Sequence, residues 1–450
     1  MTDLGDTIFA LGTAPGRAGI AVLRLSGPKS RLAVEAVTGR PAPAPRRAVL
    51  RSLSDPVLGE AIDRGIVLWL PGPATFSGED MAEFHIHGGR AVAAAMLRAL
   101  GRLEGLRPAE PGEFSRRAFE HGRLDLTEVE GIADLVAAET EAQRRQALRQ
   151  LSGALGELCE GWRGRALKAL AHVEAAIDFP DEDLPTNVVD EVRGNLSDLQ
   201  RELTAHLDDD RRGERLREGV SVAVIGPPNA GKSSLLNWLV RREAAIVSAK
   251  AGTTRDVIEV HLDLGGYPVV LADTAGLREA DDEVEAEGVR RALARAACAD
   301  LRLVVLDATT WPELDPRVAG QVSDDAIVVV NKTDLRAVSA EGRVRGRAIL
   351  PVSIRTGAGL DALLKTLESE VSRRVSDGAA PEITRERHRR ALEECAEALG
   401  RAEAGLVQAA PVELVAEDLR LAVRALGRIT GKVDVEDMLD IVFAEFCIGK

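Results

Sequence analysis

Hydrophobic residues in the first 120 positions form short runs separated by glycine and proline. The runs GIAVLRL at 19–25, GIVLWL at 65–70 and FHIH at 84–87 have the length and composition of strands. From Arg90 to about Leu103, alanine and leucine recur with helical spacing. We therefore predict an N-terminal α+β domain over residues 1–121.

The pattern becomes helical at Thr127, where apolar residues begin to recur every three or four positions. Thr127 and Glu130 fit a capping box at the start of this periodicity. The sequence FPDE at 179–182 interrupts it, and another helix is predicted over 189–207. The charged stretch DDDRRGERLREG at 208–219 is typical of a surface connection.

Strand and helix patterns alternate in the next part of the chain, which we assign to a domain at 216–375. The predicted strands are 220–226, 258–264, 269–273, 301–307, 326–331 and 348–352. The predicted helices follow residue 233 and lie at about 285–297 and 359–374. This alternation predicts a doubly wound, mostly parallel sheet.

The chain is helical again after residue 380. We expect one helical domain, 122–215 and 376–450, with the doubly wound domain inserted into it. Two separate helical units are the alternative. The fold class predicted for the whole chain is thus multidomain α/β and α+β.

Charge and composition narrow the possible functions. The net charge is −14, with 72 acidic and 58 basic residues. A protein that binds nucleic acid through charge alone has the opposite balance, so any RNA contact needs a local basic patch or a partner. The four cysteines are far apart, which disfavours a zinc site or a disulfide framework. No segment approaches the roughly 18 apolar residues of a membrane span, so we predict a cytoplasmic protein without a membrane association.

The sequence GPPNAGKS at 226–233 follows an apolar strand and precedes a helix, as a phosphate-binding loop does. Backbone N–H groups of such a loop face phosphate oxygens, and Lys232 adds a positive charge. The Ser233 hydroxyl can bind Mg²⁺. A chance glycine-rich turn in this context is a remote alternative.

Further nucleotide motifs follow in order. GTTRD at 252–256 offers Thr254 to Mg²⁺ and the γ-phosphate, and DTAG at 273–276 offers a carboxylate and a backbone N–H. NKTD at 331–334 ends a buried strand, where Asp334 can accept two hydrogen bonds that guanine donates and adenine does not. Ser353 lies in the expected base-contacting loop. This set predicts GTP rather than ATP.

The position after DTAG, where Ras-type enzymes place a glutamine that orients water, is Leu277. Leucine can neither donate nor accept a hydrogen bond, so another group must position the water. The segment EADDEVE at 279–285 supplies carboxylates, but acids at a helix start are also stabilised by the helix dipole. Local sequence alone favours that second explanation for most of them.

These motifs, with APGRAGIAVLRLSG, PGPATFSGEDMAEFHIHGG, RPAEPGEFSRRAFEHGRLDLTEVEGIADLV and the terminal FCIGK, resemble the tRNA-modification GTPase family MnmE, also called TrmE. The resemblance spans nearly the whole chain. It implies a folate-binding, dimerising N-terminal domain, a helical domain and an inserted GTPase domain. It also implies a homodimer that joins an FAD-dependent partner (GidA/MnmG) in a heterotetramer.

The reaction implied by the resemblance adds a carboxymethylaminomethyl or aminomethyl group to C5 of the wobble uridine (position 34) of certain tRNAs. The carbon would come from 5-formyl- or 5,10-methylene-tetrahydrofolate. Carried over by motif, the folate-binding residues are Arg24, Glu83, Arg123 and Lys450. Arg123 stands where a lysine is common, which keeps the charge and changes its geometry.

The resemblance further implies that K⁺ takes the place of an arginine finger and that Glu285 is the catalytic carboxylate. The implied K⁺ ligands are Asn229, Ser248, Lys250 and Thr253. The implied Mg²⁺ ligands are Ser233 and Thr254. The full set of predicted GTP-binding residues is Asn229, Ala230, Gly231, Lys232, Ser233, Ser234, Ser248, Ala249, Lys250, Ala251, Gly252, Thr253, Thr254, Asp273, Thr274, Ala275, Gly276, Asn331, Lys332, Thr333, Asp334, Ser353, Ile354 and Arg355.

Several alternatives stay open at the level of sequence. Cys447 is equally compatible with a buried apolar residue and with a thiol of the modification chemistry. Glu83, His85 and His87 share a strand face and could hold a metal, although no further ligands lie nearby in sequence. A ribosome-assembly GTPase would share the nucleotide motifs, and a non-catalytic folate-binding scaffold would use them only to change shape.

Overall fold

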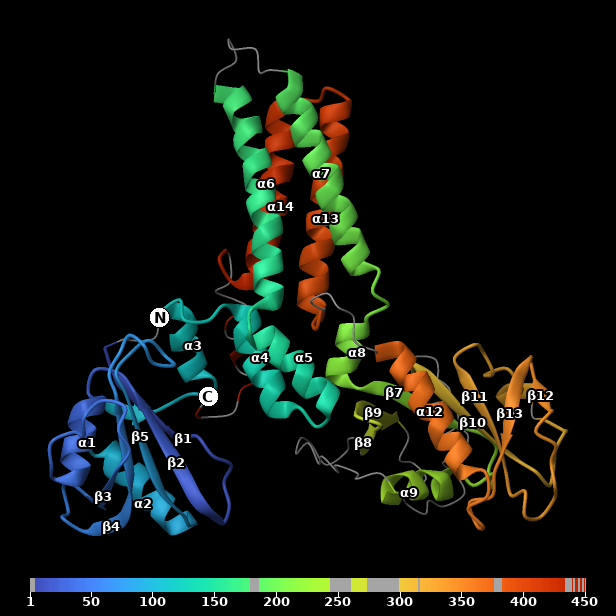
Figure 1. Ribbon diagram of the computed structural model, residues 1–450, viewed down its shortest axis with the longest axis horizontal. Helices are drawn as coiled ribbons and strands as arrows, with labels where there is room; N and C mark the ends of the chain where they lie inside the picture. The colour runs from blue at the N-terminus through green and yellow to red at the C-terminus, as the bar shows by residue number, and fades with distance from the viewer. Residues whose placement is uncertain are drawn as a thin grey trace, which may run out of the picture. The chain divides into compact units, whose positions relative to one another are not determined.

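The computed structural model describes residues 5–178, 186–242, 260–272, 299–314, 316–375 and 383–433, with residues 439, 442, 443, 446 and 449 near the C-terminus (Figure 1). The chain forms two compact units. The first unit comprises the chain up to residue 133, segment 151–163 and the chain from 423, and the second comprises 134–150 and 164–422. The domain boundaries inferred from sequence divide the chain differently and remain predictions.

The N-terminal part of the first unit is built on a six-stranded sheet of order β3-β4-β5-β2-β1-β6. Its strands are β1 (Thr7–Leu11), β2 (Ala18–Ser26), β3 (Val49–Ser54), β4 (Ala61–Leu70), β5 (Met81–Gly88) and β6 (Leu106–Pro108). Its helices are α1 (Ser30–Thr38), α2 (Arg90–Gly101) and α3 (Glu113–Glu120). The predicted α+β character is confirmed, and α2 lies where the periodicity placed it.

Alternate residues of these strands face α1 and α2. Phe9, Leu23 and Phe84 pack there against Val34 and Met96 in one buried cluster. The opposite face of the sheet carries a smaller cluster in which Phe76 and Phe114 cover Ile8 and Ala10 of β1. The sheet therefore has one fully covered face and one that is covered only in part.

A buried arginine, Arg117 of α3, ties the separate segments of this domain together. Only 1% of its surface is exposed. Its Nη2 donates to Asp6 Oδ1 at 2.6 Å and its Nη1 donates to Glu79 Oε2 at 3.0 Å. Ser26 Oγ donates to the same Glu79 carboxylate at 2.6 Å, which brings β2 into the network.

Arg107 extends this network from β6 by donating to both Glu113 and Asp6. Burial alone would raise the pKa of Glu113, but hydrogen bonds from Arg107 and from the Glu110 amide outweigh it, so the pKa lies below its ordinary value. A lowered pKa means that this stabilisation is present above about pH 4 and is lost as the solution becomes more acidic. At neutral pH the Glu113 carboxylate is therefore ionised and contributes its full stabilisation.

The second unit contains a seven-stranded sheet of order β12-β13-β11-β10-β7-β9-β8. Its strands are β7 (Val220–Ile225), β8 (Val260–Leu264), β9 (Tyr267–Ala272), β10 (Leu301–Asp307), β11 (Ala326–Asn331), β12 (Arg343–Val344) and β13 (Arg347–Pro351). The helices described with it are α9 (Lys232–Arg242), α11 (Pro316–Ala319) and α12 (Leu360–Val375). The pairings β8–β9 and β12–β13 are antiparallel and the others are parallel, which confirms the predicted doubly wound sheet.

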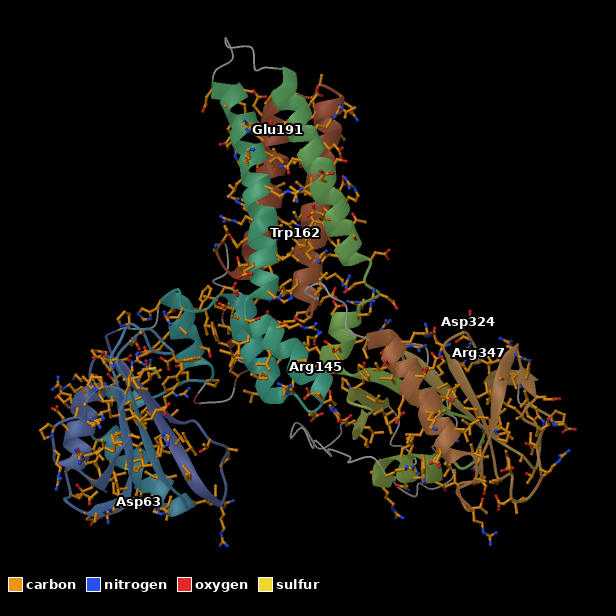
Figure 2. The ribbon with its side chains drawn as sticks, in the orientation of Figure 1. Asp63, Arg145, Trp162, Glu191, Asp324 and Arg347 are labelled. Atoms are coloured by element: carbon orange, nitrogen blue, oxygen red, sulfur yellow. The ribbon has the colours of Figure 1, made fainter. Side chains whose placement is uncertain are left out.

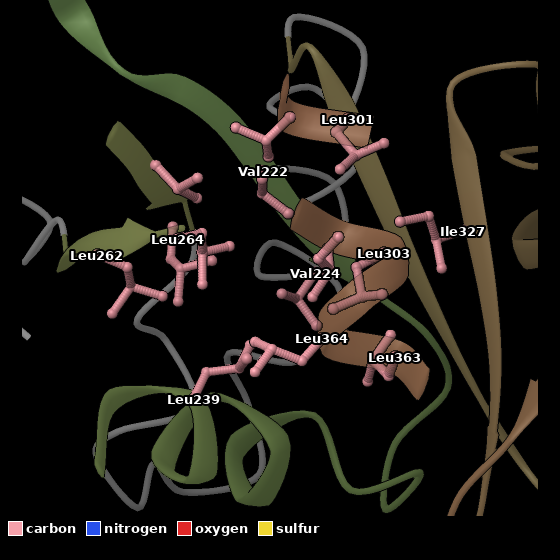
Figure 3. Close-up of a cluster of buried hydrophobic side chains, with 14 of the residues drawn as sticks. Val222, Val224, Leu239, Leu262, Leu264, Leu301, Leu303, Ile327, Leu363 and Leu364 are labelled. Carbon is pink, nitrogen blue, oxygen red and sulfur yellow. The ribbon is translucent and has the colours of Figure 1, made fainter. Parts of the chain in front are cut away.

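The core of this sheet is built mainly from aliphatic side chains. Val222 and Val224 of β7 pack with Leu303 of β10, while Leu239 of α9 and Leu363 of α12 cover them (Figure 3). The order of the strands changes direction at β7, so the segment that follows β7 lies at the topological switch point, where ligands bind in open α/β sheets.

The remaining helices are α4 (Leu126–Ala137), α5 (Glu141–Leu151), α6 (Ala154–Asp178), α7 (Thr186–Leu207), α8 (Arg212–Glu218), α13 (Glu386–Val407) and α14 (Val412–Thr430). The long helices α6, α7, α13 and α14 lie side by side (Figure 1). Ion pairs join them across the sequence, including Arg165–Glu202 between α6 and α7 and Arg420–Glu174 between α14 and α6. Helices from before and after the nucleotide motifs are thus neighbours in space.

The predicted capping box at the start of α4 is in the wrong register. Asp125 Oδ1 accepts from the Glu128 amide at 2.9 Å, and Glu128 Oε2 accepts from the Asp125 amide at 2.7 Å. Thr127 and Glu130, the predicted pair, are 0% and 1% exposed instead. An aspartate makes the same reciprocal contact as a serine or threonine, and it stands two residues earlier.

The prediction of a surface connection at 208–219 is wrong for its second half, which forms α8. Leu216 of this helix is buried in the core of the seven-stranded sheet. Glu214 is bound by Arg389 of α13 at 3.0 Å, and Arg215 donates to Asp300 at 2.7 Å. The charges that indicated solvent exposure are used to join α8 to its neighbours.

Helix α5 docks onto the β8–β9 hairpin of the same unit. The Ala142 amide donates to the Gly266 carbonyl in the hairpin turn at 3.1 Å, and His261 Nδ1 lies 2.9 Å from Glu139 Oε2. Gln146 Nε2 donates to the Gly213 carbonyl of α8 at 3.1 Å. The hairpin, α5 and α8 therefore form one hydrogen-bonded assembly.

Replacing Arg117 by alanine tests the importance of the buried network. Breaking a buried ion pair leaves the partner carboxylates unpaired and costs about 3–5 kcal/mol. We expect Arg117→Ala to increase hydrogen exchange of the β1 and β2 amides correspondingly. Arg116→Ala, which removes a half-buried Arg116–Glu120 pair one residue away, should cost about 1 kcal/mol or less. Equal exchange in the two variants would contradict the role given to Arg117.

Candidate nucleotide site

The loop that follows β7 begins at Gly226, the first residue of the predicted phosphate-binding motif. A Cβ on Gly226 would lie 2.1 Å from the Val305 carbonyl oxygen of β10, so only glycine allows this approach. Asn229 has a φ of +61°, a left-handed conformation that asparagine tolerates better than most residues. The loop is thereby turned back over the end of the sheet.

Lys232 begins α9 and points its ammonium group into this loop. Its Nζ donates to the carbonyl of Gly226 at 3.0 Å and to that of Pro227 at 2.8 Å. Backbone carbonyl oxygens are weaker acceptors for an ammonium group than phosphate oxygens, because phosphate oxygens carry negative charge. The side chain is therefore placed where a bound phosphate would be its strongest partner.

Asn331 connects this loop to the segments at the other end of the site. Its Nδ2 donates to the Ala230 carbonyl at 2.9 Å, and its Oδ1 accepts from the Ile354 amide at 3.3 Å. A Cβ on Gly231 would lie 2.2 Å from the same Nδ2, so Gly231 is required for this contact. Asn331 is 3% exposed and holds three segments together.

Asp334 lies at the edge expected to receive the base. Its Oδ1 accepts from Ser353 Oγ at 2.7 Å, and its Oδ2 lies 3.9 Å from Arg355 Nη1. The Ser353 hydroxyl fixes one carboxylate oxygen of Asp334, a residue that also lines the cavity described below. The Thr333 amide donates to the Val352 carbonyl at 3.1 Å, which keeps the two loops adjacent.

These segments enclose a cavity of about 540 Å³. It is lined by Asn229, Gly231, Lys232, Ser233, Ser234, Asn331, Lys332, Asp334, Leu335, Ile354 and Arg355. All but one of these residues belong to the predicted set, so the structure brings the described members of the set together. The exception is Leu335, which is 61% exposed and offers an apolar surface; its only sequence signal is its place directly after NKTD.

Part of the predicted site falls outside the described residues. This applies to the switch segments, to the catalytic carboxylate and to two candidates at the C-terminus. The residues concerned are Ser248, Ala249, Lys250, Ala251, Gly252, Thr253, Thr254, Asp273, Thr274, Ala275, Gly276, Leu277, Glu285, Cys447 and Lys450.

The predicted folate residues Arg24 and Glu83 are cross-strand neighbours on β2 and β5. Arg24 Nε donates to Glu83 Oε1 at 3.3 Å, and the guanidinium lies 5.6 Å from the centre of the Phe76 ring. His85 Nε2 lies 3.0 Å from the other Glu83 oxygen. A half-buried polar pair next to an aromatic ring is thus present on the partly covered face of the sheet.

Arg123 and the chain end approach the same domain from other segments. The Arg123 side chain packs near Gly78, two residues after the Phe76 that lies beside Arg24. A Cβ on Gly449, where φ is +98°, would lie 2.4 Å from the Leu11 carbonyl of β1. The residue before Lys450 is therefore in tight contact with the strand that pairs with β2.

The three residues considered for a metal do not converge. His87 Nδ1 lies 2.8 Å from Oδ1 of Asp63 on β4, a residue that Figure 2 labels. His85 Nε2 lies instead 3.0 Å from Glu83 Oε2. Within the described ranges, no group of three or more His, Cys, Asp or Glu side chains is arranged to bind a metal ion.

The sheet order, the loop after its central strand and the NKTD segment together define a P-loop GTP-binding protein. Two family models match the chain: the GTP-binding protein TrmE N-terminus over residues 7–123 and the MnmE helical domain over 126–447. The chain therefore belongs to the MnmE family of tRNA modification GTPases, and it is a GTP hydrolase. No helix in the described residues is both long and apolar enough to cross a bilayer.

Individual relatives agree with this assignment along all or nearly all of their length. The tRNA modification GTPase MnmE of Parvibaculum lavamentivorans is 59% identical over 99% of this chain and 100% of its own length. That of Paramagnetospirillum magneticum is 58% identical over the same shares. The mitochondrial 5-taurinomethyluridine-tRNA synthase subunit GTPB3 of Homo sapiens is 51% identical over 99% of this chain and 94% of its own.

Asp334→Asn tests the base-recognition end of the site. An asparagine amide inverts the hydrogen-bond pattern, so affinity for GTP should fall and affinity for xanthosine triphosphate should rise. Loss of a charge-assisted pair corresponds to roughly 2–3 kcal/mol, or about a hundredfold in Kd. Titration of both nucleotides measures the change. Unaltered GTP affinity in the variant would remove Asp334 from the base site.

Proposed function

We propose that this chain is a K⁺-dependent GTPase that acts with an FAD-dependent partner to modify the wobble uridine (position 34) of certain tRNAs. The observation that carries the proposal is a GTP-type cavity and a separate Arg24–Glu83 site in one chain. That chain is 59% identical over 99% of its length to a protein named as a tRNA modification GTPase.

The proposed reaction adds a carboxymethylaminomethyl or aminomethyl group to uridine C5, with a folate one-carbon unit as the source of carbon. The human relative is named for a taurinomethyl product, so the amine that is incorporated differs among proteins of this similarity. We further propose a cytoplasmic homodimer that joins the flavoprotein in a heterotetramer. The chain has a net charge of −14, so in this assembly the partner would supply the basic surface that binds RNA.

The proposed mechanism of hydrolysis uses Glu285 and K⁺ in place of a glutamine and an arginine finger. Asn229 supports this assignment, because it lines the cavity with its backbone turned into a left-handed conformation. K⁺ held by Asn229 would offset negative charge that develops on the phosphates, as an arginine does, and closure of two GTPase domains would exclude water. Mg²⁺ would be held by Ser233 and Thr254.

Steady-state rates in K⁺ and in Na⁺ test this mechanism. We expect K⁺ to accelerate hydrolysis by ~10³-fold, in line with the contribution of arginine fingers. Glu285→Ala should abolish turnover and leave nucleotide affinity intact, as for an interaction made mainly in the transition state. Equal rates in the two salts, or an active Glu285→Ala enzyme, would show the mechanism to be wrong.

The folate site is proposed at the Arg24–Glu83 pair. A pterin edge resembles guanine and suits a carboxylate, while the glutamate tail suits cations. Glu83 is 19% exposed at its side chain, and the Phe76 ring beside Arg24 offers a flat apolar surface. Arg123 and Lys450 would supply the further positive charge, and the tight packing of Gly449 on β1 supports a place for the chain end near β2.

Glu83→Ala and deletion of Lys450 should each weaken binding of 5-formyl-tetrahydrofolate, because each removes a polar partner of the ligand. Calorimetry measures the affinity, and intrinsic GTP hydrolysis should stay nearly unchanged in both. His87→Ala is a matched control, since His87 lies on the same strand and pairs with Asp63 instead. Wild-type folate affinity in both test variants would place the site elsewhere.

The two rival functions make different predictions, one in a deletion strain and the other in the kinetics of the purified protein. Loss of this protein should remove the modified wobble uridine from bulk tRNA, as nucleoside analysis measures. A ribosome-assembly GTPase would leave wobble uridines unchanged and alter ribosomal subunit profiles. A folate-binding scaffold without catalysis would show slow GTP turnover in K⁺ as well as in Na⁺.

A further inference from the structure

Asp307 ends strand β10 directly beside the nucleotide cavity, but it does not line it. In the parallel register its partner on β11 is Asn331, and the Ala308 amide donates to the Asn331 carbonyl at 2.8 Å. The Asp307 carboxylate is therefore held at the same level as the NKTD segment.

The two oxygens of Asp307 have separate partners. Oδ1 accepts from the Thr309 amide at 2.8 Å and from the Thr309 hydroxyl at 2.7 Å. Oδ2 accepts from Lys332 Nζ at 2.6 Å. Oδ1 thus fixes the turn after β10, and Oδ2 binds the Lys332 ammonium group.

Lys332 connects Asp307 to the nucleotide cavity. It lines the cavity wall, and its backbone has a φ of +67°, which is uncommon for a residue with a long side chain. Its side chain is 31% exposed, so its four-carbon stem would move freely without an anchor at the end. The ion pair holds the ammonium group at the end of β10, while Lys332 lines the same cavity as Asp334.

We infer that Asp307 is a positioning residue for nucleotide binding, which acts by holding Lys332 against the face where the guanine ring is bound. The inference rests on the nucleotide site proposed above. It assigns Asp307 no contact with the nucleotide and no contact with the phosphates. Its effect is therefore the same for di- and triphosphates.

This carboxylate is suited to that task. Burial raises the pKa of Asp307, but hydrogen bonds from Lys332 and Thr309 lower it by more, so the group is ionised at neutral pH. Because the Thr309 bonds hold Oδ1, the carboxylate is oriented before Lys332 reaches it. A preorganised anchor of this kind reduces the entropy lost when the ligand orders the stem.

The test compares Asp307→Asn with wild type in the full-length protein. Asparagine can still accept from Thr309, so the turn is retained while the charge that holds Lys332 is lost. We expect GDP and GTP to bind about five- to tenfold more weakly, by the same factor. In steady-state hydrolysis the loss should appear in KM and leave kcat nearly unchanged.

Two further variants separate positioning from a structural role. Lys332→Met keeps the stem and removes the ammonium group, so adding Asp307→Asn to it should cause no further loss of affinity. Thr309→Val removes the hydroxyl bond to Oδ1 but keeps both the Thr309 amide bond that orients the carboxylate and the ion pair to Lys332. Its nucleotide affinity should therefore stay close to that of wild type.

The inference is overturned if Asp307→Asn binds GDP as wild type does, or if its effect and that of Lys332→Met are additive. A loss in Thr309→Val as large as that in Asp307→Asn would also overturn it, because the turn would then be the cause. The proposed nucleotide site is tested separately by Asp334→Asn. If that variant changes base preference while Asp307→Asn has no effect, the site stands and only the positioning role is lost.

Discussion

The buried amide of Asn331 is the contact on which the nucleotide cavity depends. It joins the Ala230 carbonyl of the phosphate loop to the Ile354 amide of the base loop. Since a buried amide without partners costs about 1–3 kcal/mol, the two loops are held in one arrangement. Only glycine fits at position 231, because a Cβ there would lie 2.2 Å from Asn331 Nδ2. The phosphate and base ends of the site are thereby fixed before a ligand binds.

In the N-terminal domain, the motifs that most resemble the family serve two physical purposes. Arg117 and Glu79 bury their charges in a network that joins α3, the loop before β5 and β2. Arg24 and Glu83 pair on the partly covered face of the sheet, where both stay accessible to a ligand. A motif residue is thus a ligand candidate when its charge is incompletely buried, and a structural one when its partners surround it.

The sequence predicted β2, β4 and β5 of the first sheet, every strand of the second sheet except β12, the long helices and most of the cavity, because these follow from periodicity and from glycine-rich motifs. It did not predict α8, since Glu214 and Arg215 look solvated until Arg389 and Asp300 are brought to them by distant segments. The capping register at Asp125 was missed because serine, threonine and aspartate are nearly equivalent there. Leu335 and Asp307 carry no motif, and only three-dimensional packing places them at the site.

The docking of α5 on the β8–β9 hairpin has a mechanical consequence. Three residues lie between GTTRD and β8, and DTAG directly follows β9, so the hairpin is the piece of sheet between the two segments. Its turn is bound by Ala142 and its first strand by Glu139, at points on either side of the α5 start. A slip of one residue along a strand, about 3.3 Å, would break both bonds at once. The two contacts with the α5 segment are therefore expected to be kept or lost together.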